Sequence, residues 1–561
     1  MRPPELVYSV DETPPPALVV FSALQHVAVN SITLIFPVII AREAGLPPGQ
    51  LIDVISLAML AMGISTILLC ARWRFVGCGY LCPTGLSQIF VGPSLFAVHF
   101  GGLPLVFGMT AVAGIIQVAI APLLRRWRAL LPTEIAGLVI AIVGLSLAVY
   151  GMRFMLGPHN EMRATYLLVS GFTLATMTIL NVWTKGYIKL FAVLIGIVAG
   201  AVASKFAGLL DLSDVIPKEG LAILHVPRIA GFGWKFDISL LAPFAVAALA
   251  TTLRTMGDIS NAQRLNDSGW VRPSFRSLSG GVVANGLGSL LAGLVGSFGL
   301  NSNSSSVGLS GAMGITSRSI GLATGIAFAF LSLVPFAAVG FAAMPPPVMG
   351  ATLFFTSAFV FATGIQMIAS RLLDSRKSLV IGFSFAMAVM ADVYADEFSR
   401  LPLALKPIFD NSLVLGTVCA VLLNLVMRIG VSRRIALKFG PGPVDPDAVV
   451  RFLTEQGAHW AARRDVVNRA VFGLLQSFEV LGELQGPAEV EASFDEFNLD
   501  IRIRYVGPPL VIPERRPSSQ EIVADEAGER LLAGYLLRGT ADRISCRSVG
   551  ERAEISLQYE H

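Results

Sequence analysis

The chain has 561 residues, of which 54% are apolar and only 14% are charged, and its mean hydropathy is +0.68. Soluble domains carry roughly 25% charged residues, so this composition argues against a soluble globular enzyme. The long apolar runs also argue against a coiled coil, a disordered chain or a disulfide framework. A formal net charge of +4 is too small to indicate a nucleic-acid partner. The composition indicates a polytopic helical membrane protein.

Apolar segments follow one another between residues 17 and 430. The hydrocarbon core of a bilayer needs about 20 helical residues, and fourteen segments approach that length. We therefore predict an all-α polytopic membrane protein with fourteen transmembrane segments, followed by a small cytoplasmic α+β domain. The clear segments are 17–40, 50–70, 104–124, 133–151, 164–183, 188–208, 279–297, 319–341, 347–369, 378–392 and 408–428, and the weaker ones are 79–99, 238–262 and 302–317.

Two of the weaker segments are unsuited to a regular helix in lipid. Residues 79–96 contain two prolines and three glycines, and residues 299–314 are rich in serine and asparagine. Irregular or polar backbone persists at membrane depth only where protein or a water-filled cavity covers it. In a seven-plus-seven arrangement these are the third segment of each repeat, where inverted-repeat transporters bind substrate. The alternative is a packing kink at Pro83 and a serine-rich helix contact at 302–306.

The distribution of Lys and Arg predicts the orientation of the chain. Loops 99–103, 298–301 and 342–347 contain neither residue, whereas the alternate loops are basic. The positive-inside rule then places both termini in the cytoplasm, as expected for a multi-pass protein of a bacterial inner membrane. The basic residues on the predicted cytoplasmic side are Arg72, Arg74, Arg125, Arg126, Arg128, Lys185, Arg264, Arg272, Arg276, Arg318, Arg371, Arg376 and Lys377.

The composition changes after residue 430, which divides the chain into four parts. We predict a cytoplasmic N-terminal tail at 1–16, a transmembrane domain at 17–430, a linker at 431–444 and a cytoplasmic α+β domain at 445–561. The last part shows amphipathic helical periodicity and strand alternation. Its predicted elements are one or two helices up to 481, a strand at 497–506, a helix at 526–541 and strands at 543–548 and 553–559.

Polar side chains inside apolar segments are the candidate functional groups. Gln25 and His26 lie in the first segment, and ionisable groups at membrane depth are functional hypotheses by default; alternatively, His26 hydrogen-bonds a neighbouring helix. Arg254 and Asp258 are four residues apart, so they lie on one helical face. They either neutralise each other or present the guanidinium to an anionic or carbonyl-bearing ligand.

The run from Asn301 to Ser306 precedes VGLSGAMG, which predicts a short helix whose N-terminus points into the membrane centre. Such an end offers free backbone donors and a positive dipole, which suits a planar polar ligand or an anion. Small polar residues are also common contacts between membrane helices.

These motifs resemble those of the nucleobase-ascorbate transporter family, which contains the xanthine/uracil permeases (nucleobase:cation symporter-2). The resemblance rests on the QH pair of the first segment, TMGD at 255–258 and SSVGLSGAMGITSR at 305–318. It extends through GYLCPTGLSQIFVGP in the third segment and MPPPVMGATLFFTSAFVFATGIQMI in the twelfth, and covers roughly residues 17–430.

The resemblance implies fourteen segments in two inverted repeats of seven, with core and gate domains. It further implies an elevator motion and proton- or sodium-coupled symport of uracil, xanthine or urate. It also implies contact with membrane lipid and a homodimer formed through the gate domains. The substrate would lie between short strands of the third and tenth segments. The predicted substrate-binding residues are Gln25, His26, Ser87, Arg254, Asp258, Asn303, Ser304, Ser305, Ser306 and Gly308.

This sequence departs from the family pattern where the ligand would be held. The acid expected three residues before Gly257 is replaced by Arg254, and the expected Gln/Glu and Asn of the tenth segment are replaced by Ser305 and Ser306. Gly308 and Asp258 match the pattern. The loss of the acid and the gain of Arg254 favour urate or another anionic ligand over neutral uracil, and bring the chain closer to anion transporters of the same fold.

The end of the C-terminal part resembles the closing helix and strands of histidine-kinase-like ATPase domains. The Asp-x-Gly-x-Gly nucleotide loop is missing from YVGPPLVIPERRPSS at 505–519, so we do not expect ATP binding. The alternative to transport is then a transporter-derived sensor that signals through this domain. Paired carboxylates, a nucleophile with its base and a metal cluster do not occur at suitable spacing, so we expect no enzymatic activity, no cofactor and no metal site.

Overall fold

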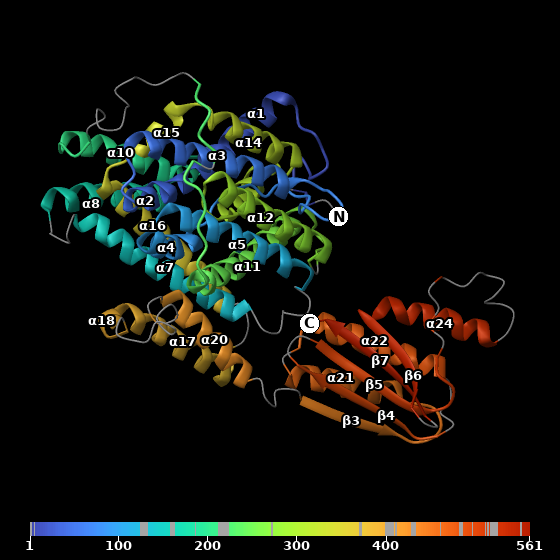
Figure 1. Cartoon of the computed structure of the whole chain (residues 1–561). Helices are drawn as coiled ribbons and strands as arrows, with labels where there is room; N and C mark the ends of the chain where they lie inside the picture. The colour runs from blue at the N-terminus through green and yellow to red at the C-terminus, as the bar shows by residue number, and fades with distance from the viewer. Residues whose placement is uncertain are drawn as a thin grey trace. The chain divides into compact units, whose positions relative to one another are not determined.

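The computed structural model divides the chain into two compact units, Met1–Asn424 and Leu425–His561, which are described separately (Figure 1). It describes residues 3–4, 6–123, 133–157, 163–185, 187–210, 224–229, 231–270, 273–369, 373–398, 409, 412–427, 433–460, 462–481, 486–495, 498–510, 512, 515, 526–549 and 552–560. Among the basic residues used to predict orientation, Arg125, Arg126, Arg128, Arg272 and Arg371 lie outside the described residues.

Among the described residues of the first unit, the regular elements are helices apart from two short strands. Within the described ranges, eight helices are long and apolar enough to cross a membrane, and a bent pair makes a ninth candidate. The helices of the first half are α1 (Pro16–Ser31), α2 (Ile35–Glu43), α3 (Pro48–Cys70), α4 (Val91–Gly101), α5 (Leu103–Ile120), α7 (Thr133–Leu156), α8 (Ala164–Trp183), α9 (Tyr187–Leu190) and α10 (Ala192–Phe206). Those of the second half are α11 (Leu241–Asn266), α12 (Phe275–Val295), α13 (Ser304–Met313), α14 (Arg318–Leu331), α15 (Pro335–Ala342), α16 (Pro346–Ile368), α17 (Ser375–Val393), α18 (Ala395–Phe398) and α20 (Ser412–Met427).

Three predicted segments differ from single regular helices in instructive ways. Segment 319–341 is two helices, α14 and α15, bent by 83°, and Pro335 begins the second because proline suits a first helical position. Segment 17–40 contains the 3-10 turn η1 (Ile32–Leu34) between α1 and α2. Segment 238–262 is less irregular than its polar residues suggest, because α11 runs unbroken from Leu241 to Asn266.

Both segments predicted to be broken contain a strand instead of a continuous helix. Strand β1 (Thr84–Leu86) pairs antiparallel with β2 (Leu300–Ser302), with Gly85 opposite Asn301. The pairing continues beyond the strands, since Ser87 N donates to Gly299 O at 2.9 Å and Asn303 N donates to Pro83 O at 3.0 Å. The interrupted backbone therefore satisfies its own polar groups inside an apolar unit, as membrane depth requires.

Glycines allow the long helices of this unit to approach closely. A Cβ added to Gly63 of α3 would lie 2.6 Å from Gly325 O of α14, and one on Gly325 would lie 2.7 Å from Gly63 O. Gly137 of α7 and Gly364 of α16 stand in the same reciprocal relation, each 2.7 Å from the other's carbonyl oxygen. Backbone thus packs against backbone, as small residues permit between membrane helices.

The predicted N-terminal tail is partly ordered by pairing with the second half of the unit. We call residues 6–12 the N-terminal strap. Tyr8 forms a parallel bridge with Ile315, Val7 N donates to Gly314 O at 2.8 Å, and Thr316 N donates to Tyr8 O at 2.9 Å. Asp11 also pairs with Arg318 at the start of α14 and with Arg72 after α3. The strap therefore joins the end of α13 to the start of α14.

The second unit is an α+β layer built on a five-stranded antiparallel sheet of order β3-β4-β5-β7-β6. Its strands are β3 (Arg433–Phe439), β4 (Ala488–Phe494), β5 (Asn498–Val506), β6 (Arg543–Val549) and β7 (Arg552–Glu560), and its helices are α21 (Pro446–His459), α22 (Arg464–Leu481) and α24 (Glu526–Thr540). Strand β3 falls within the predicted linker 431–444, so the folded unit begins before residue 445. Its pairing with β4 is a long-range contact that the local pattern does not reveal.

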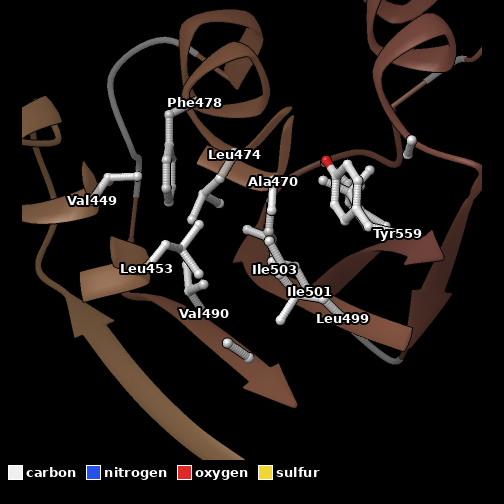
Figure 2. Close-up of a cluster of buried hydrophobic side chains, with 14 of the residues drawn as sticks. Val449, Leu453, Ala470, Leu474, Phe478, Val490, Leu499, Ile501, Ile503 and Tyr559 are labelled. Carbon is white, nitrogen blue, oxygen red and sulfur yellow. The ribbon is translucent and has the colours of Figure 1, made fainter. Parts of the chain in front are cut away.

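Strand alternation sorts the side chains of this sheet onto two faces. Leu453, Leu474, Phe478, Val490 and Ile501 are among the buried side chains that fill the space between the helices and one face of the sheet (Figure 2). Burial of this apolar surface is the main favourable contribution to folding of the unit. The other face carries charge.

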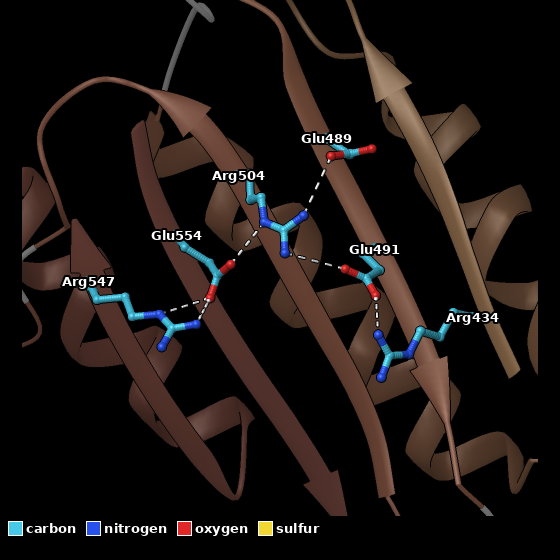
Figure 3. A network of polar contacts seen from close by, with 6 residues as sticks. All are labelled: Arg434, Glu489, Glu491, Arg504, Arg547 and Glu554. Atoms are coloured by element: carbon cyan, nitrogen blue, oxygen red, sulfur yellow. Dashed lines mark hydrogen bonds and ion pairs between the residues drawn. The ribbon is translucent and has the colours of Figure 1, made fainter. Parts of the chain in front are cut away.

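Charged side chains of that other face alternate in sign across the strands (Figure 3). Arg504 Nε donates to Glu554 Oε2 at 2.9 Å, and Arg547 Nη2 donates to Glu554 Oε1 at 2.7 Å. Arg504 also pairs with Glu489 and Glu491, at 3.7 and 3.6 Å. Burial by itself raises the pKa of Glu554, but the hydrogen bonds from Arg504 and Arg547 outweigh it and hold this pKa below its usual value.

The glycine contact between α3 and α14 makes a first prediction. Gly63→Leu forces the side chain into backbone of α14, and we expect it to cost about 1–3 kcal/mol of stability, as overpacking does. Gly171→Leu on the exposed side of α8 is the control, because no atom lies within 4 Å of its added Cβ. The measurement is the melting temperature of the purified protein in detergent; equal melting temperatures for both variants would contradict the close contact.

The Glu554 network makes a second prediction, and its sign follows from the lowered pKa. Stabilisation by ionised Glu554 is present above pH 4.5, the ordinary value for this group, and is lost as the pH falls through the lower folded pKa. At pH 7 we expect Glu554→Gln to lower the opening free energy of the β5 and β7 amides by about 1–3 kcal/mol. Hydrogen exchange on the full chain measures this, with exposed Glu455→Gln as the unaffected control. If the difference in opening free energy between Glu554→Gln and the parent grows as the pH is lowered, the lowered pKa of Glu554 is refuted.

Candidate functional site

The paired strands β1 and β2 hold a group of polar side chains inside the membrane unit. Helix α13 begins directly after β2, and Asn303 caps it by accepting a hydrogen bond from Ser305 N at 3.0 Å. Thr84 Oγ1 and Thr66 Oγ1, joined at 2.9 Å, attach β1 to α3. The site is thus built from short rigid elements.

Helix α11 contributes two polar residues that contact β2 and the start of α13. Asp258 accepts hydrogen bonds from Ser302 Oγ and Ser304 Oγ, both at 2.5 Å. One helical turn earlier, Thr255 Oγ1 donates to Asn301 Oδ1 at 2.7 Å. Asp258 is buried, and its two oxygens are each occupied by a hydroxyl donor. These contacts orient α13 against α11.

His26 and Asn30, one turn apart on α1, meet the same helix from the other side. A hydrogen bond of 2.6 Å joins His26 Nδ1 to Ser306 Oγ, and Asn30 Nδ2 donates to Ser306 Oγ at 3.0 Å. Asn303 Nδ2 donates in turn to Asn30 Oδ1 at 2.8 Å. His26 and Ser306 are fully buried. The network fixes the first turn of α13 to α1.

Arg254 does not pair with Asp258, although the two lie one turn apart on α11. Within the described residues no ion pair or hydrogen bond joins them, because Asp258 turns to the serines. With the Gln88 amide oriented so that its oxygen faces the guanidinium, this oxygen accepts from Arg254 Nη1 at 2.5 Å and from Nη2 at 3.3 Å. Arg254 Nε is buried without a partner. The guanidinium therefore faces a neutral amide.

Open space remains beside several of these residues. A Cβ added to Gly257 of α11, to Gly308 of α13 or to Gly92 of α4 would have no atom within 4 Å. Ser305, in the first turn of α13, is exposed. Gly257 and Gly308 are themselves exposed, so no described side chain covers α11 and α13 at these two positions.

The structure brings most of the predicted site residues together. His26, Asn303 and Ser306 form one network and Asp258 and Ser304 another, while Arg254 reaches Gln88. Two predicted residues lie outside these networks. The Ser87 hydroxyl accepts a hydrogen bond from Ile89 N at 3.3 Å and so caps the 3-10 turn η2 (Gln88–Phe90). Gln25 is buried, and its Oε1 has no hydrogen-bond partner.

Several residues of these networks were not predicted. Asn30 follows His26 by four residues, a spacing that could have identified it as a neighbour on the same face. Gln88 carries no comparable local signal, since its role depends on which segments meet. Asn301 and Ser302 lie in the polar run, and Thr255 in the TMGD motif, that the sequence singles out. A further buried cluster lies behind β2, where Asn285 Nδ2 donates to Gln117 Oε1 at 3.1 Å and to Leu300 O at 3.4 Å.

Residues 17–396 match the xanthine/uracil permease model, whose description is "Permease family". This is more than half of the chain, so the chain belongs to this permease family. It is a multi-pass membrane transporter and not an enzyme, and the family resemblance inferred from its motifs is confirmed. The C-terminal unit lies outside the matched residues, and its likeness to kinase-type ATPase domains stays a prediction.

Individual relatives match almost along their full length. Uric acid permease PucK of Bacillus subtilis is 29% identical over 414 residues, which are 72% of this chain and 93% of that protein. Xanthine permease XanP of Escherichia coli is 27% identical over 440 residues, 75% of this chain and 94% of the relative. A putative purine permease of Clostridium perfringens is 28% identical over 427 residues, with 75% and 93% covered.

A solved structure shares the fold. The murine Solute Carrier 26 family member A9 anion transporter, in its inward-facing state, aligns with a TM-score of 0.51 and 13% identity, covering 78% of this chain and 73% of that chain. At this identity the likeness concerns the fold alone.

The hydroxyl of Ser306 supplies a third prediction. Ser306→Ala leaves His26 Nδ1 without its partner and removes one acceptor of Asn30, which we expect to cost about 1–3 kcal/mol. Ser310→Ala is the matched control on the same helix, because its buried hydroxyl donates only to Val307 O, at 2.7 Å. The melting temperature in detergent should fall for Ser306→Ala and stay near the parent for Ser310→Ala. Equal changes would mean that the α1 contact does not hold α13.

Proposed function

We propose that the protein is a secondary active transporter of a nucleobase-type substrate, of the xanthine, uracil or urate class, in the bacterial inner membrane. The observation that carries the proposal is the pairing of β1 with β2, which gathers Arg254, Asp258 and the first turn of α13 beside open space. The names of the relatives, which are purine, xanthine and uric acid permeases, support this substrate class. In this proposal Arg254 and Ser305 contact the substrate, and His26 positions the site.

An elevator mechanism with two inverted repeats of seven segments is part of the proposal. Suppose that α3 of the first repeat corresponds to α12 of the second, and α5 to α14. The contact between α5 and α12 then corresponds to the contact between α14 and α3, and β1 corresponds to β2. Helices α7 and α16 correspond to each other in the two repeats, and they also pack against each other. This recurrence supports a duplicated architecture in which the domain with β1 and β2 moves against one with α7 and α16. Coupling to a proton or sodium ion, a homodimer and cytoplasmic termini complete the proposal.

Two other functions remain as alternatives. An anion transporter of the same fold is favoured by the guanidinium at position 254, which hydrogen-bonds the neutral amide of Gln88 and makes no direct ion pair with Asp258. A sensor that signals through its C-terminal unit is favoured by the α+β domain beyond the permease match. Deletion of residues 445–561 separates the sensor from the transporter. Transport survives the deletion if the membrane unit works alone, whereas a sensor loses signalling.

The fourth prediction tests transport directly. Cells lacking their own purine permeases, expressing this chain, are expected to accumulate radiolabelled urate, xanthine or uracil. We expect Arg254→Ala and Ser305→Ala to lower this uptake at least tenfold, because each removes a proposed hydrogen bond to the substrate.

Two controls make the uptake result interpretable. Glu455→Gln, on the exposed side of α21, should transport like the parent, and membrane expression of every variant is measured by immunoblot. If neither Arg254→Ala nor Ser305→Ala changes uptake, the substrate binds elsewhere. If the parent itself takes up none of the three bases, the nucleobase proposal is wrong.

A further inference from the structure

Helix α3 ends at Cys70 and is followed by a largely exposed loop at 71–76, which we call the α3 loop. The base of this loop is fixed to α12, because Gly77 N donates to Gly280 O at 2.9 Å. Gly77 has a φ of +95°, and a Cβ at this position would lie 1.9 Å from Ala71 O. Glycine therefore allows the chain to turn back tightly against the end of α3.

Basic and aromatic side chains alternate along the α3 loop, in the order Arg72, Trp73, Arg74 and Phe75. The Trp73 side chain is 59% exposed and the Phe75 side chain is 71% exposed. Single exposed apolar residues are common on protein surfaces, but apolar side chains that stand together mark interaction surfaces. The loop therefore presents a surface for a partner with an apolar part.

The positive charge of this loop is only partly balanced. Arg72 pairs with Asp11 of the N-terminal strap at 3.6 Å, and Asp11 also pairs with Arg318. Arg74 forms no ion pair within the described residues, and its guanidinium lies over the Phe75 ring, 5.2 Å from the centroid. A single carboxylate thus faces two arginines, and the third is left without one. The partner should carry negative charge.

The position of the loop relative to the membrane identifies this partner. Gly49–Cys70 is a candidate membrane span, and its 22 residues measure about 33 Å as a helix, close to the ~30 Å thickness of the hydrocarbon core. The α3 loop begins directly after this span, so it lies at the level of the lipid headgroups. Aromatic side chains accumulate at this level, and basic side chains there attract anionic lipids.

We propose that the α3 loop binds an anionic phospholipid of the leaflet on the predicted cytoplasmic side. Trp73 and Phe75 insert among the upper acyl chains, which removes their rings from water. Arg74 hydrogen-bonds the headgroup phosphate, whose oxygens suit the planar guanidinium. Because the base of the loop is fixed to α12, the bound lipid holds this end of α3 at a constant depth. The proposal is independent of the solute that the protein transports.

A lipid titration of the purified full-length protein tests the role of charge. The melting temperature is measured in phosphatidylcholine nanodiscs that contain rising fractions of phosphatidylglycerol, because a ligand of the folded state raises it. We expect a rise for the parent, and we expect Arg74→Gln to need about fivefold more phosphatidylglycerol for the same rise, the effect of one basic residue near an anionic surface. Each rise is taken from the variant's own value in pure phosphatidylcholine, so altered stability alone does not change the result.

Two controls decide whether the loop itself is the lipid site. Arg264→Gln removes another exposed arginine, in the last turn of α11, which has no aromatic neighbour in the sequence. This variant should titrate like the parent; an effect equal to that of Arg74→Gln would mean general attraction by charge and would overturn the proposal. Soluble glycerol phosphate should leave the melting temperature of the parent unchanged. An equal rise with it would make the ligand a free phosphate and not a lipid.

Fluorescence quenching tests the insertion of the rings. Brominated acyl chains quench a tryptophan that lies among them, and the contribution of Trp73 is the difference between the parent and Trp73→Phe. We expect this difference to decrease in brominated phosphatidylglycerol, and an unquenched difference would show that Trp73 stays in water. Light scattering of Phe75→Ala in detergent tests the other occupant. An unchanged oligomeric state is expected, and a loss of oligomers would make the loop an interface between copies of this chain.

Discussion

The membrane unit depends on how two interrupted segments satisfy their backbone groups without water. Each unpaired amide or carbonyl in an apolar interior costs several kcal/mol, so a break in a membrane helix requires internal partners. Here β1 and β2 supply them for each other, and Asn303 continues the arrangement by capping α13 and donating to Pro83. That pairing places the start of α13 where side chains of α1 and α11 hydrogen-bond it.

Arg254 and Asp258 of α11 have different surroundings although they share one helix face. Two serine hydroxyls hydrogen-bond the Asp258 carboxylate, whereas the Arg254 guanidinium hydrogen-bonds the neutral amide of Gln88 and is attracted to Asp258 without a direct ion pair. Hydroxyl donors stabilise an anion, and a single amide oxygen compensates a cation incompletely. The Arg254 guanidinium is therefore less completely paired than the Asp258 carboxylate, and its Nε has no hydrogen-bond partner among the described residues.

Much of the fold could be predicted from the sequence because apolar length and composition are local properties. The proline and glycine content of 79–96 and the polarity of 299–314 identified the interrupted segments, and the motif likeness identified the family, which is confirmed. The contact of His26 with Ser306 and the use of Gln88 could not be predicted, because they require knowing which distant segments meet. Strand β3 was missed for the same reason, since its partner β4 lies about fifty residues further along the chain. The assignment of site residues to substrate binding stays a prediction.

The N-terminal strap has a consequence for how the protein is made. Its bridge joins Tyr8 to Ile315, so the pairing of the strap with the junction of α13 and α14 forms only after the second half of the unit has been synthesised. Contacts of such sequence separation form late, because the intervening chain must first be ordered. A paired strap therefore indicates a membrane unit in which α13 and α14 are folded. An antibody or protease directed at residues 6–12 would distinguish folded from incompletely folded molecules.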